Sequence, residues 1–268
     1  MKILVCVKQV PDTNEIKIDP VTNTLIREGV ASIVNPFDGF ALEAAARIKD
    51  NAPDTEIVVL SMGPQQAETA LRECLAIAAD RAYLVTDRIF GGSDTLATSY
   101  ILSKAVEKVE ELEGSKFDAV FCGKQATDGD TAQVGPELAE HLGYPQVTYA
   151  LEVKTADDGL HVLREAEDGK EVIGVQLPCL ITFTKPSFDP RFPTIKRKIA
   201  ARKLPIAHLT SAELTNIDPT HAGLKGSPTK VKRTYVPPRK EAGMMIKEES
   251  TEASALKLYD LLSKAHVI

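Results

Sequence analysis

The sequence predicts an α/β fold: a parallel sheet flanked by helices, with an antiparallel hairpin extension and an extended C-terminal arm that ends in a helix. Through the first half of the chain, short and nearly all-apolar runs alternate with helical patterns, as in a parallel sheet covered by helices. From Val147 the pattern changes to strand pairs separated by Asp-Gly turns. The 268 residues, 43% of them hydrophobic, suffice to bury a core.

The first half should hold the strands and helices of the main sheet. Asp38 is expected to cap a helix that runs through Ile48, Pro64 to open the next helix, and Ser93 or Asp94 to cap the third. Four apolar runs are expected as strands buried on both faces: Ile3–Val7, Glu56–Ser61, Ala82–Val85 and Asp118–Cys122. The inward faces of the second, third and fourth helices are expected from Ala67, Ala70, Leu71, Cys74 and Ala78, from Ala97, Ile101, Ala105, Val109 and Leu112, and from Val134, Leu138 and Leu142.

The second half should add hairpins, a loop and a tail. Turns at Asp157-Asp158-Gly159 and Asp168-Gly169 predict antiparallel hairpins at an edge, and Cys179–Phe183 should return as a buried strand. Three prolines between 185 and 193 predict an exposed loop, followed by a short basic helical segment to Lys203.

The C-terminal region should be an arm without a core of its own. Residues 217–240 are rich in Pro, Gly, Lys and Thr and lack an apolar face. The last helix carries an apolar stripe formed by Ala255, Leu258, Leu262 and Ala265. The stripe packs either on its own domain or on another subunit. We therefore predict a domain over 1–222, with a loop at about 185–203, and an arm and helix over 223–268.

Composition narrows the function classes. A net charge of −6 and the absence of tryptophan disfavour nucleic acid as a partner, although basic residues crowd 196–203 and 230–240. Four scattered cysteines without a Cys-x-x-Cys pair indicate a reducing compartment and no metal site. The first apolar run is too short for a signal peptide and no run is long enough to insert in a membrane, so we expect a cytoplasmic protein.

The loop after the fourth strand is the best candidate binding site. Glycines lead from Cys122 into a helix expected to begin near Thr131, where backbone amides could hold a phosphate. Asp130 is expected to cap this helix, leaving the amides of Thr131, Ala132 and Gln133 to the phosphate. The alternative is a plain Asp-Gly turn and helix cap. Because neither a Walker A loop nor a Gly-x-Gly-x-x-Gly fingerprint occurs, the P-loop fold and the ordinary dinucleotide-binding fold lose support.

No catalytic constellation stands out. The five histidines are isolated, no Gly-x-Ser-x-Gly elbow occurs, and Cys122 on a buried strand is expected to serve packing. Any chemistry would therefore come from a bound cofactor.

Several motifs resemble, in order and spacing, the beta subunit of electron transfer flavoproteins, and the resemblance covers nearly the whole chain. They are Val7-Lys8-Gln9-Val10-Pro11-Asp12, Asn35-Pro36-Phe37-Asp38, Ser61-Met62-Gly63-Pro64, Gly123-Lys124-Gln125-Ala126 through Gly135, and Pro190-Arg191-Phe192-Pro193 to Lys203. The resemblance implies an adenine-nucleotide-binding, Rossmann-like fold and a heterodimer in which the C-terminal arm embraces an alpha subunit.

The resemblance also implies site residues. It implies that Ile195 is an apolar anchor that docks on a partner dehydrogenase, with Arg191, Lys196, Arg197 and Lys198 around it. Cofactor binding is implied for Cys6, Asn35, Pro36, Phe37, Asp38, Met62, Thr95, Gly123, Lys124, Gln125, Ala126, Thr127, Asp128, Gly129, Asp130, Thr131, Ala132, Gln133 and Val134.

Two kinds of cofactor occur in such beta subunits: structural AMP in ordinary members and a second FAD in members that bifurcate electrons. Residues 91–98 and 128–135 resemble the bifurcating group, and Ala132 and Gly135 leave room for a flavin. The resemblance then implies that FAD accepts hydride from NADH. One electron goes to ferredoxin and the other, through the alpha-subunit FAD, to a flavin dehydrogenase of acyl-CoA or hydroxy-acid type. Such activity would exist only within a complex.

Two further classes remain as alternatives. A stand-alone adenine-nucleotide sensor would share the α/β layout but would not need residues 217–268. A nucleotide-dependent ligase should show an acid or base near the phosphate loop, and none stands out.

Overall fold

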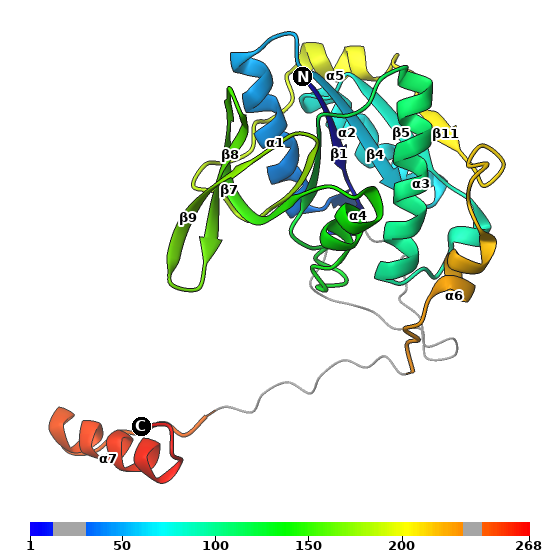
Figure 1. Cartoon of the computed structure of the whole chain (residues 1–268). Helices are drawn as coiled ribbons and strands as arrows, with labels where there is room; N and C mark the ends of the chain where they lie inside the picture. The colour runs from blue at the N-terminus through cyan, green and yellow to red at the C-terminus, as the bar shows by residue number, and fades with distance from the viewer. Residues whose placement is uncertain (13–30, 233–242) are drawn as a thin grey trace.

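A nine-stranded sheet forms the centre of the chain in the computed structural model, which describes residues 1–12, 31–232 and 243–268 (Figure 1). The strand order is β11-β5-β4-β1-β6-β10-β7-β8-β9. The strands of the parallel part are β11 (Ala207–Leu209), β5 (Arg81–Val85), β4 (Glu56–Met62), β1 (Lys2–Cys6), β6 (Ala119–Gly123), β10 (Cys179–Phe183) and β7 (Gln146–Ala156).

The predicted hairpins extend one edge of this sheet. β8 (Gly159–Ala166) pairs antiparallel with β7, and β9 (Gly169–Val175) pairs antiparallel with β8. The returning strand β10 inserts between β6 and β7, and all five of its residues are buried. A separate pair, β2 (Gln9–Pro11) and β3 (Ser32–Val34), is antiparallel.

Helices cover both faces of the sheet (Figure 1). Ile3 and Val5 of β1 pack in one core with Ala41 and Leu71, whereas Leu4 packs in the other core. The first core includes residues of α1 (Pro36–Asn51) and α2 (Glu68–Ile77), and the second includes residues of α3 (Thr95–Glu113) and α4 (Val134–Leu142). The central strands are therefore buried on both faces, as their unbroken apolar runs predicted.

Several local predictions need correction. Asp38 is not the cap of α1: the helix begins at Pro36 with Asn35 at the N-cap, since proline suits the first turn. Pro64 precedes a short 3-10 helix, η1 (Gln65–Ala67), rather than opening α2. Leu112, in the last turn of α3, is 53% exposed and does not face the core. The cap of α3 is Asp94, one of the two predicted residues, whose carboxylate accepts from the Ala97 amide at 3.0 Å.

The C-terminal part of the body ends in short elements. They are α5 (Ile195–Ala201), β11, the 3-10 helix η3 (Pro219–His221) and α6 (Gly223–Gly226). α6 and the residues after it remain attached to the body: the Gly223 amide donates to Ser93 Oγ at 3.1 Å and the Thr229 amide to Asp94 Oδ2 at 2.9 Å. The packed body therefore continues past the expected boundary at 222. The part of the predicted arm over 233–242 lies outside the described residues.

The last helix, α7 (Thr251–Lys264), buries none of its residues and lies apart from the α/β body in Figure 1. Ser250 caps it by accepting from the Ala253 amide at 3.1 Å. Leu258 of the apolar stripe is 49% exposed. Among the described residues, no helix combines the length and apolarity that a bilayer span requires.

Truncation should separate the packed part of the C-terminal region from the rest. A chain ending at Lys232 should keep its free energy of unfolding within about 0.5 kcal/mol, because α7 buries nothing. A chain ending at Ala222 should lose about 1–3 kcal/mol of its free energy of unfolding, because it lacks the hydrogen bonds to Ser93 and Asp94. Urea unfolding of both chains checks this, and equal midpoints would show that Gly223–Thr229 do not stabilise the body.

Candidate nucleotide-binding site

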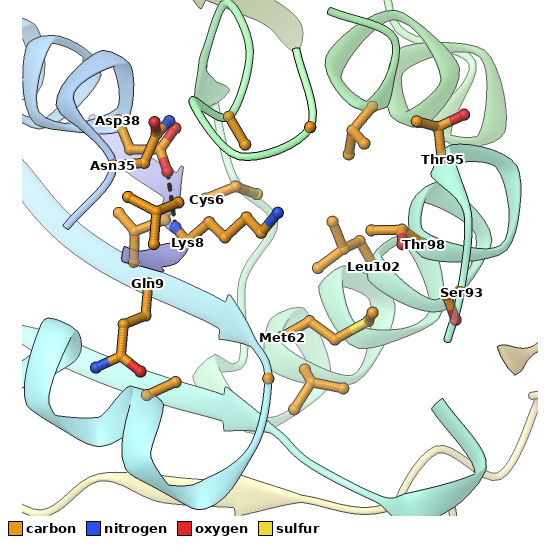
Figure 2. A pocket seen from close by; sticks show the side chains of 18 of the residues that line it. Cys6, Lys8, Gln9, Asn35, Asp38, Met62, Ser93, Thr95, Thr98 and Leu102 are labelled. Atoms are coloured by element: carbon orange, nitrogen blue, oxygen red, sulfur yellow. Dashed lines mark hydrogen bonds between the residues drawn. The ribbon is translucent and has the colours of Figure 1, made fainter. Parts of the chain in front are cut away.

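A pocket of about 1000 Å³ opens at the carboxyl ends of β1, β4, β5 and β6 (Figure 2). Helix N-termini and their free amides gather at this edge of a parallel sheet, which is where such folds bind ligands. One side is formed by Cys6 to Pro11 and the loop after β6, and the other by the segment Thr86–Thr95 with Thr98 and Leu102 of α3. The position agrees with the site expected from the strand ends.

Asn35 and Asp38 join three backbone segments at one end of the pocket. Asp38 Oδ2 accepts from the Lys8 amide at 2.7 Å, the bond drawn in Figure 2, and Oδ1 accepts from the Gly123 amide at 3.1 Å. Asn35 Nδ2 donates to the Gln125 carbonyl at 2.8 Å. We call this group the Asn35/Asp38 bridge. It fixes the end of β1, the start of α1 and the loop after β6 relative to one another.

The bridge is buried and closely packed. Asn35 is 1% exposed and Asp38 is 6% exposed. Burial raises the pKa of Asp38 from 3.8 to about 7, against the hydrogen bonds from Asn35, Lys8 and Gly123 that lower it. A Cβ at position 123 would overlap Asp38 Oδ1 and lie 2.8 Å from the Asp38 amide nitrogen. Only glycine allows this approach of β6 to α1.

Residues 124–133, which we call the phosphate loop, differ locally from the prediction. α4 begins at Val134 with Gln133 at its N-cap, so Asp130 is not the cap of a helix starting near Thr131. Asp130 and Ala132 each have a φ of 55°, a left-handed conformation that interrupts the helix before it can begin. The Asp130 carboxylate instead accepts from the side-chain amide of Gln125.

The phosphate loop can nevertheless hold an anion. Within the described part of the chain, no acceptor satisfies the amides of Thr131, Ala132 and Gln133. Lys8 Nζ pairs with Asp128 Oδ1 at 2.6 Å, so the charge of that carboxylate is neutralised beside the pocket. Strained left-handed residues and unpaired amides in one loop are typical of ligand sites.

The opposite wall of the pocket comes from the segment between β5 and α3. The short 3-10 helix η2 (Arg88–Phe90) starts there, capped by Asp87, whose carboxylate accepts from the Ile89 amide at 3.2 Å. Thr229 reaches this wall from the C-terminal region. The side chain of Arg88 is exposed and adds a cation to the lining.

Most of the predicted cofactor residues line this pocket. Five predicted residues are not part of the lining: Pro36, Phe37, Thr127, Asp128 and Asp130. Thr127 and Asp128 act indirectly, through Asn35 Oδ1 and Lys8 Nζ respectively. The predicted cofactor residues that do line the pocket are Cys6, Asn35, Asp38, Met62, Thr95, Gly123, Lys124, Gln125, Ala126, Gly129, Thr131, Ala132, Gln133 and Val134.

Sequence reasoning missed other lining residues. Lys8 and Gln9 lie in a motif that carried the resemblance, and Ser93 and Thr98 lie in another, so the signal was present. Arg88 and Thr229 lie outside those motifs and come to the pocket only through the fold.

Gly135 has a different role from the one expected. It lines the pocket, but a Cβ there would overlap Thr182 Cγ2 of β10. The glycine is therefore required for packing α4 on the sheet and is not simply spare room for a flavin.

The predicted docking residues lie together around α5. Ile195 is 80% exposed, and Phe192, which was not singled out, is 91% exposed. Lys196 and Lys198 are exposed as well. We call residues 185–203 the docking loop.

Two of the predicted docking residues hold this loop in place. Arg191 pairs with Glu43 at 2.8 Å and with Asp50 at 2.6 Å, both on α1. Arg197 donates to the carbonyls of Ala76 and Leu75, at the end of α2. Both guanidinium groups are thus engaged inside the chain and support the exposed side chains beside them.

No group of three or more His, Cys, Asp or Glu residues suited to a metal occurs in the described ranges. Burial raises the pKa of the Cys179 thiol to about 12, and all four cysteines are free.

Comparison with known proteins gives consistent full-length similarity. The Electron transfer flavoprotein domain family matches residues 22–214. The electron transfer flavoprotein subunit beta of Megasphaera elsdenii is 51% identical over 257 residues, which covers 96% of this chain and 95% of that protein. The Caffeyl-CoA reductase-Etf complex subunit CarD of Acetobacterium woodii is 50% identical over 268 residues and covers 100% of both chains. Protein FixA of Azorhizobium caulinodans is 44% identical over 261 residues, 96% of this chain and 92% of that protein.

Replacing Asp38 by Asn should destabilise the chain in a pH-dependent way. An amide has one acceptor oxygen, so the Lys8 or Gly123 amide loses its partner, at a cost of about 1–3 kcal/mol. Because the folded pKa is raised to about 7, the protonated carboxyl stabilises the fold fully below pH 3.8, and this contribution is lost as the pH rises through 7.

Between pH 5 and pH 8, the difference in unfolding free energy between the native chain and Asp38→Asn should therefore fall steadily, by about 2–3 kcal/mol. Urea unfolding across this range measures it, with the exposed Asp54→Asn as a matched control. A difference that grows with pH would contradict the assignment.

Proposed function

The chain belongs to the electron transfer flavoprotein family as a beta subunit, and we propose that its pocket holds an FAD which accepts hydride from NADH and bifurcates the electrons. One electron then goes to ferredoxin and the other, through the FAD of the alpha subunit, to a flavin dehydrogenase. The observation that carries the proposal is the size of the pocket together with the free amides of the phosphate loop.

The pocket fits a dinucleotide better than a mononucleotide. At about 1000 Å³ it lies at the upper end of the range of about 300–1000 Å³ for ligand sites. AMP is only one half of FAD and would leave much of this volume to water. The second half of the pocket is lined by Met62, Leu102 and Thr98, a largely apolar wall suited to a flat aromatic ring.

The residues available suit each part of the cofactor. The amides of Thr131, Ala132 and Gln133 would hold the diphosphate, and Lys8 and Arg88 are cations of the pocket lining. FAD would supply the chemistry, because a flavin can accept a hydride and pass on single electrons. The Asn35/Asp38 bridge would hold the site rigid, and the Asp128 carboxylate of the phosphate loop is already paired with Lys8.

The partner proposals rest on the relatives and on two exposed surfaces. Relatives named as a subunit beta and as a complex subunit support a heterodimer with an alpha subunit. The unburied stripe of α7 is the surface proposed to pack on that subunit. The name of the Acetobacterium woodii relative supports a dehydrogenase partner of acyl-CoA type.

The docking loop is proposed to bind that dehydrogenase. Phe192 and Ile195 supply an apolar centre, and Lys196 and Lys198 supply a charged rim. We also propose a cytoplasmic location, which the four free cysteines support.

The alternatives have less support. A non-bifurcating beta subunit with structural AMP would use the same phosphate loop but not the volume beside it. A stand-alone nucleotide sensor is disfavoured because relatives named as subunits match the chain over its C-terminal region as well.

The nucleotide content of the complex tests the proposal. The purified alpha/beta heterodimer should release two FAD and little AMP on denaturation, as measured by chromatography of the extract. One FAD with one AMP per heterodimer would contradict the bifurcating proposal and favour the non-bifurcating beta subunit with structural AMP.

Substitutions in the docking loop should affect delivery of electrons to the dehydrogenase alone. Ile195→Ala should weaken binding by ~1–3 kcal/mol, as expected of an interface anchor. Arg191→Ala should weaken it similarly by freeing the loop from α1, and Arg191→Lys should restore part of the loss. NADH oxidation with an artificial acceptor should not change.

Lys154→Ala, on the exposed part of β7, serves as the control for this series. Unchanged transfer kinetics in Ile195→Ala would show that the loop does not dock.

A further inference from the structure

The C-terminal segment Gly223–Thr229 is attached to one wall of the pocket. The Asp94 amide donates to Ser227 Oγ at 2.8 Å, and the Thr229 amide donates to Asp94 Oδ2 at 2.9 Å. The Gly223 amide donates to Ser93 Oγ at 3.1 Å. Both Ser93 and Asp94 line the pocket. We call residues 223–229 the latch.

The latch is a closely packed part of the fold. Ser227 is 4% exposed, and its hydroxyl donates to the Gly223 carbonyl at 2.7 Å while it accepts from the Asp94 amide. Gly223 has a φ of 61°, and a Cβ there would overlap the Ile89 carbonyl oxygen, so only glycine permits this approach. The backbone of the latch therefore packs directly on the segment that forms the pocket wall.

The latch also holds a carboxylate of the pocket lining. Asp94 Oδ1 accepts from the Ala97 amide at 3.0 Å, as the cap of α3, and Oδ2 accepts from the Thr229 amide. Burial raises the pKa of Asp94, but the hydrogen bonds from Ala97 and Thr229 outweigh it and hold the pKa below the usual 3.8. Asp94 is therefore an anion at neutral pH. An anion in the lining would repel the phosphates of a nucleotide if it were free to turn toward them.

The wall that the latch holds contacts the phosphate loop. The Thr95 hydroxyl lies 3.3 Å from Gln133 Oε1 and 3.2 Å from Glu137 Oε1, so it donates to one of these two oxygens. Gln133 carries one of the amides that we propose to hold the diphosphate. Thr229 itself lines the pocket. Contacts thus run from the latch, through the start of α3, to the phosphate loop.

We propose that Ser227 and Thr229 are positioning residues for the nucleotide in this pocket: they fix Asp94 and the start of α3, and without them the nucleotide is released faster. The inference rests on the proposed function only in requiring a nucleotide with phosphates in the pocket, so FAD and AMP serve it equally. The bonds of the latch exist before the nucleotide binds. A wall that is already ordered lowers the entropic cost of binding, which is how the latch would retain the ligand.

Release of the nucleotide from the intact heterodimer tests the proposal. Ser227→Ala removes the acceptor of the Asp94 amide, and Thr229→Pro removes the amide that holds Asp94 Oδ2. Because each variant loses a hydrogen bond that orders the wall, each should release one nucleotide per heterodimer about 10-fold faster than the native complex. Chromatography of the nucleotide retained after gel filtration at set times measures this. Thr229→Ser, which keeps the amide and a hydroxyl, should retain the native rate.

Two controls separate positioning from general stability. Val109→Ala, in the buried part of α3 and outside the pocket lining, should lower the urea midpoint and leave the release rate unchanged. Thr220→Ala removes a hydroxyl that donates to Asp218 at 2.7 Å in the same C-terminal region, and should not change the release rate either.

Native release rates in both Ser227→Ala and Thr229→Pro would overturn the proposal, and so would equally fast release from Val109→Ala. Loss of the alpha subunit from the latch variants would also overturn it, because the latch would then be a subunit contact. If the unaltered heterodimer holds AMP in place of a second FAD, the proposed bifurcation fails, whereas the release rate of AMP then tests the latch in the same way.

Discussion

The fold of the binding site depends on one buried polar group that ties together segments distant in sequence. Asp38 accepts hydrogen bonds from the ends of β1 and β6, and Asn35 holds the loop that follows β6. Parallel strands end with their backbone amides unpaired, and burying such amides without partners is costly. The Asn35/Asp38 bridge satisfies them and fixes the phosphate loop at the same time. Gly123 is part of this arrangement, because any side chain there would displace Asp38.

The same helix that starts at the bridge also supports the docking loop. α1 carries Asp38 near its N-terminus and, on later turns, Glu43 and Asp50, which hold Arg191. The pocket and the exposed Phe192 and Ile195 are therefore fixed to one rigid element. The opposite wall of the pocket is held in a comparable way by α6: Leu224 lies against Gly92, and the Gly223 amide donates to Ser93 Oγ.

Helices and strands could be predicted from the sequence where a local pattern or a general packing rule determines them. A strand buried on both faces must be apolar throughout, so β1, β4, β6 and β10 were visible as apolar runs. The cap at Asp94 follows from its immediate neighbours. β11, only three residues long and preceded by a helix, gave no comparable signal.

Asp38 was wrongly expected to cap α1. Its actual partners, the amides of Lys8 and Gly123, could not be predicted, because Gly123 is 85 residues away in the sequence. The start of α4 was misplaced since nothing in the local sequence shows that Asp130 and Ala132 adopt a left-handed backbone.

An experimental structure of the heterodimer tests the central claim most directly. It should show one continuous flavin dinucleotide in the pocket, its diphosphate on the amides of Thr131–Gln133, with Asp38 bridging Lys8 and Gly123. A mononucleotide confined to the phosphate loop, with the wall at Met62 and Leu102 left to water, would contradict it.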